Sequence, residues 1–147
     1  MSNLASNPAF LAYAVSLLIL SLNLTALWAY SAVVRGKSKT TPNEEDLGRG
    51  NKLLPENPPE VARVLRAHAN AMANIVPFVI LGLVYVLSGG SGVAAAAIFA
   101  VFTASRLAHS FAYLGGRQPW RTVFFSLGAV TTVVLMGFVV HALAVVT

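Results

Sequence analysis

Two short stretches of the sequence combine cationic, amide and aromatic side chains at the spacing of a helix face. Members of each stretch lie three and four residues apart: Arg63, Arg66 and Asn70 in the first, and Arg106, His109 and Tyr113 in the second. Side chains at this spacing are neighbours on one face of a helix. A further arginine, Arg121, is followed directly by Thr122. Because arginine offers a fork of donors suited to carboxylates, these residue types predict a pocket for a small anionic molecule.

Four apolar segments must position these side chains. They cover about residues 8–34, 74–87, 93–114 and 123–146. Crossing the hydrocarbon core of a bilayer takes about 20 apolar residues, which three of the segments supply unaided. The second segment is shorter, but Pro59 can begin a helix whose polar first half precedes it. The predicted helices are therefore about 8–34, 59–87, 93–114 and 120–146, with one long polar connection over about 35–58.

The composition favours a membrane protein. Of the 147 residues, 56% are hydrophobic and 10% are charged, whereas a soluble domain has about 25% charged residues. A soluble fold of this size could not bury so much apolar surface. The length suits one domain, so we expect residues 1–147 to form a single all-α unit, an integral membrane four-helix bundle.

Several function classes are excluded by what the sequence lacks. It contains no cysteine, and therefore no disulfide framework, thiolate metal site or cysteine nucleophile. The three histidines are scattered singly, so no metal site is predicted. The net charge of +5 comes from a clustered set of cations rather than a broad basic face. Nucleic-acid binding is therefore not expected.

Charge also predicts the orientation of the helices. With four crossings, the cations of the long connection and those around the last turn share one side: Arg35, Lys37, Lys39, Arg49, Lys52, Arg63, Arg66, Arg106, Arg117 and Arg121. Cytoplasmic loops of membrane proteins carry an excess of lysine and arginine. The cationic side, with the anion pocket, is therefore predicted to be cytoplasmic, and both termini to lie on the opposite side.

The same residues also admit simpler interpretations. Interfacial arginines can snorkel to the bilayer surface and merely anchor helices, the interpretation we favour for Arg63 and Arg117. Asn70 could be an interhelical hydrogen-bonding residue, and His109 could serve packing. Tyr113 could belong to an aromatic belt. Arg106 lies deeper along its helix, which favours a functional role.

The residues around these positions resemble known motifs. Residues 63–70 (RVLRAHAN), continuing through 74–78 (NIVPF), are similar to the second helix of the MAPEG superfamily, the membrane-associated proteins in eicosanoid and glutathione metabolism. Residues 106–114 (RLAHSFAYL) resemble its third-helix motif, and 119–122 (PWRT) the start of its fourth helix. Arg35 and the loop residues 42–46 (PNEED) are also similar to the family. The resemblance covers essentially the whole chain and is closest to the microsomal glutathione transferase and prostaglandin E synthase branch.

The resemblance implies a homotrimer of four-helix subunits that uses glutathione as co-substrate near the cytoplasmic face, between neighbouring subunits. The residues that would bind glutathione are Arg35, Arg66, Asn70, Arg106, His109, Tyr113 and Arg121. Arg121 would stabilise the thiolate, with Thr122 in the position of a serine that can donate to the sulfur. A free thiol has a pKa of about 8.5, which a nearby arginine lowers. The second substrate would be a lipophilic electrophile that arrives from the bilayer.

These expectations amount to a glutathione transferase of the detoxification type, which could also act as a glutathione peroxidase. The sequence departs from the family pattern at Ala73, where a glutamate is usual, and at Phe125, where the prostaglandin branch has a tyrosine. The loss at Ala73 motivates the alternative, a non-catalytic lipid-binding membrane protein of the same superfamily.

Overall fold

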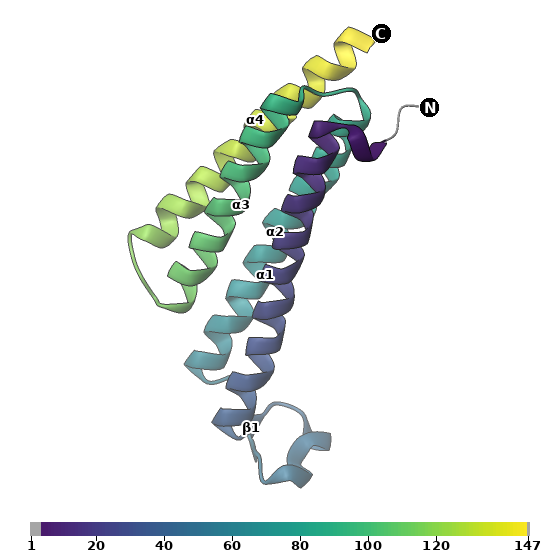
Figure 1. The fold of residues 1–147 in the computed structure, drawn as a ribbon. Coiled ribbons are helices and arrows are strands. Elements are labelled where there is room, and N and C mark those ends of the chain that lie inside the picture. Colours follow the sequence, from purple (N-terminus) through teal and green to yellow (C-terminus); the bar gives the residue numbers. More distant parts are fainter. Residues whose placement is uncertain (1–3, 147) are drawn as a thin grey trace.

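Four long helices form an elongated bundle in the computed structural model, which describes residues 4–146 except for the side chains of residues 48, 49 and 146. They are α1 (Pro8–Ser38), α2 (Pro59–Leu87), α3 (Gly92–Leu114) and α4 (Trp120–Val146). Each is long and apolar enough to cross a membrane. The chain runs up and down, so both termini lie at one end of the bundle (Figure 1). The prediction of an all-α, four-helix membrane protein is confirmed.

The ends of the helices follow from local sequence. Asn7 caps α1 by accepting a hydrogen bond of 2.9 Å from the backbone N–H of Ala9, as a side-chain oxygen before a helix commonly does. The helix continues to Ser38, four residues beyond the predicted end at 34. Lys39 then adopts a left-handed conformation with φ of 49°. The cations in the last turn of α1 stabilise it through the helix dipole, which is why these polar residues remain helical.

The connection between α1 and α2 is folded back on itself. Strand β1 (Thr40–Thr41) pairs in parallel with β2 (Lys52–Leu53), and a 3-10 helix η2 (Glu44–Arg49) lies between them. Backbone bonds of 2.9 Å join Lys52 N to Lys39 O and Leu54 N to Thr41 O. The polar connection therefore begins at residue 39 rather than 35. The side chain of Arg49, included among the cations above, lies outside the described part.

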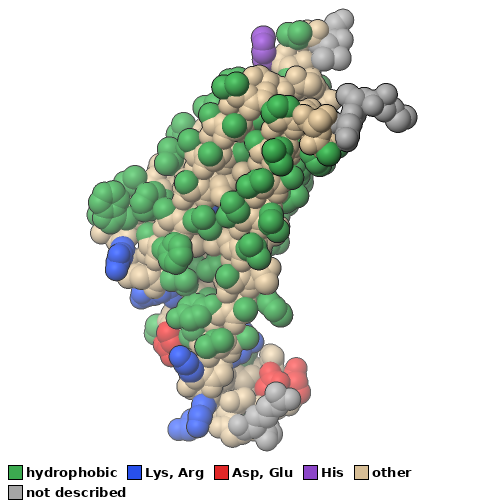
Figure 2. All heavy atoms as spheres, in the orientation of Figure 1, with side chains coloured by type: hydrophobic (Ala, Val, Ile, Leu, Met, Phe, Trp, Pro, Cys, Tyr) green, Lys and Arg blue, Asp and Glu red, His purple; other side chains and the backbone are tan. Residues whose placement is uncertain are grey.

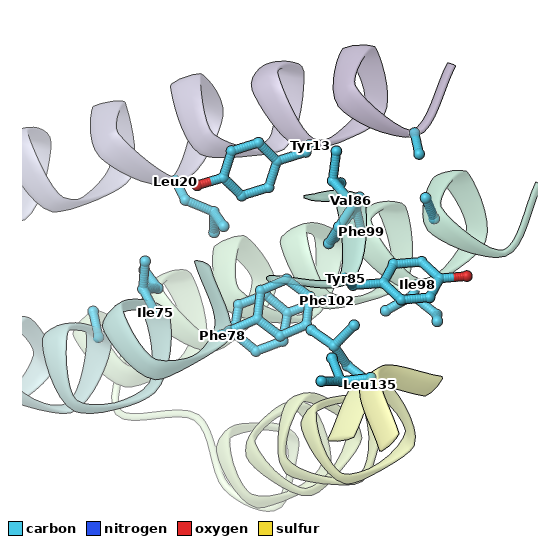
Figure 3. Close-up of a cluster of buried hydrophobic side chains, with 14 of the residues drawn as sticks. Tyr13, Leu20, Ile75, Phe78, Tyr85, Val86, Ile98, Phe99, Phe102 and Leu135 are labelled. Atoms are coloured by element: carbon cyan, nitrogen blue, oxygen red, sulfur yellow. The ribbon is translucent and has the colours of Figure 1, made fainter. Parts of the chain in front are cut away.

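All four helices contribute to one apolar core (Figure 3). At its centre the rings of Phe78 and Phe102 stack with centroids 3.5 Å apart and planes 3° apart. Phe99 meets Phe78 edge to face at 5.8 Å. Helix α2 continues through Pro77, as membrane helices permit. The stacked rings pack α2 against α3 about one helical turn from Arg106.

A polar contact fastens α1 to α3 within the apolar region. Nδ2 of Asn23 donates a hydrogen bond of 3.1 Å to Oγ of Ser110. Such contacts commonly join helices in membrane bundles. The Lys and Arg side chains gather at the end of the bundle opposite the termini, here called the cationic end (Figure 2).

Candidate functional site

Arg106 is completely buried between the helices. Its side chain is 0% exposed, and its Nη2 donates a hydrogen bond of 2.7 Å to Oδ1 of Asn70 on α2. Among the described residues, its Nε and Nη1 have no hydrogen-bond partner. A buried charge without a counter-charge is costly, above all at membrane depth. Arg106 therefore carries a buried positive charge that no acidic group in the described part of the chain neutralises.

Gly128 on α4 makes room for this arginine. A Cβ atom at position 128 would lie 3.1 Å from Oγ of Ser105 and 3.3 Å from Cδ of Arg106. Both separations are closer than ordinary van der Waals contact. With any other residue here, Ser105 or the Arg106 stem would have to shift by a few tenths of an ångström to let α4 pass at this distance.

A cavity of about 240 Å³ opens beside Asn70, the hydrogen-bond partner of Arg106, while Arg106 itself does not line it. Its wall brings together side chains from three helices: Asn70, His109, Tyr113, Arg121, Thr122 and Phe125. Because Oδ1 of Asn70 already accepts from Arg106, Nδ2 is the end of this amide that can donate to a bound molecule. Arg106 thus fixes which way the amide points.

Arg121 is held at the start of α4 by two residues of α3. Its guanidinium carbon lies 4.8 Å from the centroid of the Tyr113 ring, a cation–π contact. The carbonyl oxygen of Arg121 lies 2.9 Å from Nδ1 of His109. Since a carbonyl only accepts, Nδ1 of His109 carries the hydrogen. In the described part of the chain, Nε2 of this histidine is buried without a partner.

Gln118 completes the site from the turn before α4, and the sequence patterns did not predict it. Its amide lies between Arg121 and Thr122. With the oxygen toward the guanidinium, Oε1 accepts from Nη2 at 2.8 Å and from Nε at 3.1 Å, while the amide nitrogen donates to Oγ1 of Thr122 at 3.1 Å. This orientation satisfies every group, whereas the reverse would leave the arginine donors facing an NH₂ group. The hydroxyl proton of Thr122 is then free to donate elsewhere.

Two of the predicted binding residues lie apart from this cavity. Arg35 lines a second cavity of about 610 Å³, at the end of α1, whose wall also includes Trp28, Thr41 and Asp46. Arg66 is exposed on α2 and lines neither cavity. A single chain therefore brings together Asn70, Arg106, His109, Tyr113, Arg121 and Thr122, and leaves Arg35 and Arg66 outside the group.

Comparison with known proteins identifies the family. The sequence profile of the MAPEG family matches residues 10–141. The chain belongs to the MAPEG family. Its relatives in this family include prostaglandin E synthase of Homo sapiens, which is 37% identical over 124 residues, 83% of this chain and 82% of the relative. Microsomal glutathione S-transferase 1 of Bos taurus is 35% identical over 134 residues, 87% of this chain and 86% of the relative.

The MAPEG match confirms the resemblance drawn from the helix motifs, and it runs through every candidate site residue. The individual roles of those residues stay predictions. Within residues 4–146, no three His, Cys, Asp or Glu side chains are grouped as a metal ion would require. The polar groups of this MAPEG site are arginine donors, one imidazole, two hydroxyl groups and the amides of Asn70 and Gln118.

Proposed function

We propose that this chain is a membrane-bound glutathione transferase, in which the cavity at the cationic end holds glutathione and activates its thiol. The observation that carries the proposal is Arg106, which is fully buried and has two nitrogens without partners in the described part of the chain. Glutathione brings two carboxylates and can supply the missing negative charge. The relatives named microsomal glutathione S-transferase 1, at 35% identity, support the same ligand.

The residues around the cavity suit the parts of such a ligand. Nδ2 of Asn70, oriented by Arg106, suits a carboxylate or peptide carbonyl. The guanidinium of Arg121, held over Tyr113, suits the sulfur. Phe125 gives the cavity an apolar wall, which suits a lipophilic second substrate that arrives from the bilayer.

Activation of the thiol follows from these placements. A cation next to the thiol lowers its pKa, so the proton leaves to water and a larger fraction is thiolate at neutral pH. The hydroxyl of Thr122, whose oxygen accepts from Gln118, donates to the sulfur. With an aryl halide, the thiolate sulfur attacks the ring carbon that carries the halogen, a C–S bond forms, and the halide leaves with the electrons of the broken bond.

We further propose that the active unit is a homotrimer with its cationic end in the cytoplasm and both termini on the opposite side. In one chain the cavity that Arg35 lines is separate from the cavity that Arg121 lines. A neighbouring subunit that brings the two together would complete the site. The exposed apolar face of α2, which includes Met72, Val76 and Ile80, supports contact between copies. The lysine and arginine bias supports the orientation.

The test is a glutathione titration of the purified protein in detergent, followed by the ultraviolet absorbance of the thiolate and then by conjugation to an aryl halide. We expect a saturable thiolate signal and turnover. Arg121→Ala should lose about 100-fold in conjugation rate, the usual cost of removing a donor to developing or stabilised negative charge, with a much smaller loss of binding. Arg63→Gln, which removes an exposed arginine outside the cavity, should keep both.

Three results would contradict this proposal in different ways. Equal losses of rate and binding in Arg121→Ala would make Arg121 a binding residue only. Glutathione binding without turnover would rule out the proposed transferase activity. A protein that neither bound glutathione nor showed turnover would favour the non-catalytic lipid-binding alternative, which the alanine at position 73 suggests.

A further inference from the structure

A separate cavity of about 580 Å³ lies where α3 ends and α4 begins. Its wall consists of small and aromatic residues with one arginine: Ala108, Phe111, Ala112, Gly115, Arg117, Trp120 and Phe124. It shares no lining residue with the cavity that contains Arg121. On α4, Trp120 and Phe124 face this cavity, whereas Arg121, Thr122 and Phe125 face the other. The proposed glutathione site and this cavity therefore lie on different faces of α4.

The cavity is apolar along its depth. Trp120 and Phe124 stack with ring centroids 6.0 Å apart and planes 24° apart. The alanines of α3 provide a floor without bulky side chains, and Phe111, 75% exposed, stands at its edge. From Gly115 to Ala108 the helix rises by about 10 Å. The cavity thus runs about 10 Å along α3, from the cationic end toward the middle of the bundle.

Arg117 supplies the one charge, and the turn holds it in place. Gly116 has a φ of 64°, and bonds run from Gly116 N to Tyr113 O at 3.1 Å and from Arg117 N to Ala112 O at 2.9 Å. This is the paired pattern that ends many helices, with glycine at the left-handed position. A Cβ at Gly115 would lie 3.4 Å from Nε and 3.5 Å from Cγ of Arg117. The arginine side chain therefore lies along the mouth of the cavity.

The turn is supported from the other side as well. A Cβ at Gly116 would lie 2.7 Å from Nη1 of Arg63 on α2, so Arg63 packs directly against the turn. In the part of the chain that the structure describes, no ion pair involves Arg117. Figure 2 shows cationic side chains next to hydrophobic ones at the end of the bundle where α3 turns into α4. A mostly apolar cavity with one arginine among its lining residues matches a molecule with an apolar chain and one anionic head.

We propose that this cavity binds a single long-chain carboxylate, a free fatty acid, with its head on Arg117 and its chain against Trp120 and Phe124. A carboxylate is the planar anion that the arginine fork fits in two contacts. A cavity of about 580 Å³ has the size that holds one small ligand. A phospholipid has two chains and a bulky head, whereas this cavity offers one cation and a lining of seven residues. Binding requires no glutathione, so it stands apart from the proposed transferase activity.

The test uses Trp120 as the reporter. Trp28 is the other tryptophan of the chain, and Trp28→Phe leaves Trp120 as the sole tryptophan, which can be excited selectively over the tyrosines. The protein is placed in nanodiscs of zwitterionic phosphatidylcholine and titrated with brominated stearate, which quenches indole fluorescence on contact. Probe dissolved in the bilayer quenches fluorescence in proportion to its content. We expect an additional, saturable component of quenching from probe bound in the cavity. Arg117→Gln should weaken the apparent affinity about five- to tenfold, the value of a charge-assisted pair at an interface.

Matched variants and probes separate the alternatives. Lys52→Gln, which removes an exposed cation at the same end of the bundle but outside the cavity, should leave the affinity unchanged. Ala108→Phe should fill the slot and abolish saturable quenching, whereas Ala104→Phe, one turn away and outside this cavity, should not. The methyl ester of brominated stearate has no charge. Its affinity for the protein with Arg117 should be no higher than that of brominated stearate for Arg117→Gln.

Two outcomes would overturn the proposal. Quenching that rises only linearly with probe content, and equally in Arg117→Gln, would show dissolved probe rather than a site. Saturable quenching by a brominated anionic phospholipid in place of the fatty acid would assign the cavity to a boundary phospholipid. Circular dichroism of each variant keeps a folding defect from being mistaken for a loss of binding.

Discussion

Replacing Gln118 should raise the pKa of bound glutathione without removing any residue that contacts it. Gln118→Ala removes two hydrogen bonds, of 2.8 and 3.1 Å, that orient the guanidinium of Arg121. Hydrogen bonds to charged groups are worth about 1.5–3 kcal/mol when buried, but Gln118 is exposed. We therefore expect a total loss of about 1 kcal/mol. At 1.36 kcal/mol per pKa unit, the thiol pKa rises by about 0.7 units.

The consequence is a rate that depends on pH in a defined way. Well below the thiol pKa, the thiolate fraction and kcat/KM should fall about fivefold in Gln118→Ala, which corresponds to the same 0.7 units. At high pH, where glutathione is fully ionised in both proteins, the rates should converge. The assay is kcat/KM for an aryl halide across pH, together with thiolate absorbance of the bound glutathione.

Gln118→Glu sharpens the test because it is nearly the same shape. A carboxylate at this position would pair with Arg121 and compete with the thiolate for its charge. The loss at neutral pH should therefore exceed that of Gln118→Ala. If Gln118→Glu were as active as the wild type, or if the loss in Gln118→Ala persisted unchanged at high pH, orientation of Arg121 by Gln118 would be refuted.

Two further predictions concern the buried arginine. Gly128→Ala should lower the free energy of unfolding by about 1–3 kcal/mol, the usual cost of overpacking, and weaken glutathione binding, because its Cβ would lie 3.3 Å from Cδ of Arg106. Thermal unfolding and glutathione titration measure the two effects. Gly137→Ala, whose new Cβ would have no atom within 4 Å, is the matched control. Asn70→Asp should raise the unfolding temperature, because it gives Arg106 a counter-charge at the 2.7 Å contact. The same change should weaken glutathione binding at least tenfold, and a variant that gained both stability and affinity would contradict the assignment of Arg106 to an anionic ligand.

Most of the fold was predictable because a bilayer imposes a simple rule on sequence. Segments of about 20 apolar residues must be helices, so the four helices followed from hydropathy and from Pro59. The extension of α1 to Ser38 did not follow from hydropathy, because the charged residues Arg35 and Lys37 end the apolar segment and resemble residues of a loop. The strands at Thr40–Thr41 and Lys52–Leu53 depend on two segments meeting in space, which no local pattern encodes.

The site was predictable where its residues share a helix and not where they meet across helices. Spacing alone placed His109 and Tyr113 on one face with Arg106. The contact between Arg106 and Asn70 depends on how α2 and α3 pack. Gln118 was missed because a polar residue in an exposed turn is usually solvated, and the only signal was its place three residues before Arg121.

The hydrogen bond between Asn23 and Ser110 ties α1 to α3 at one point along its length. Ser110 follows His109 directly in the sequence. On α1, Arg35 lies twelve residues beyond Asn23, about 18 Å away at the rise of a helix. A tilt of α1 by about 5° around this bond would move Arg35 by about 1.6 Å over that length. Displacements of about 1 Å can change catalytic rates 100-fold. A tilt of this size would therefore be enough to change any contact that Arg35 makes with a ligand.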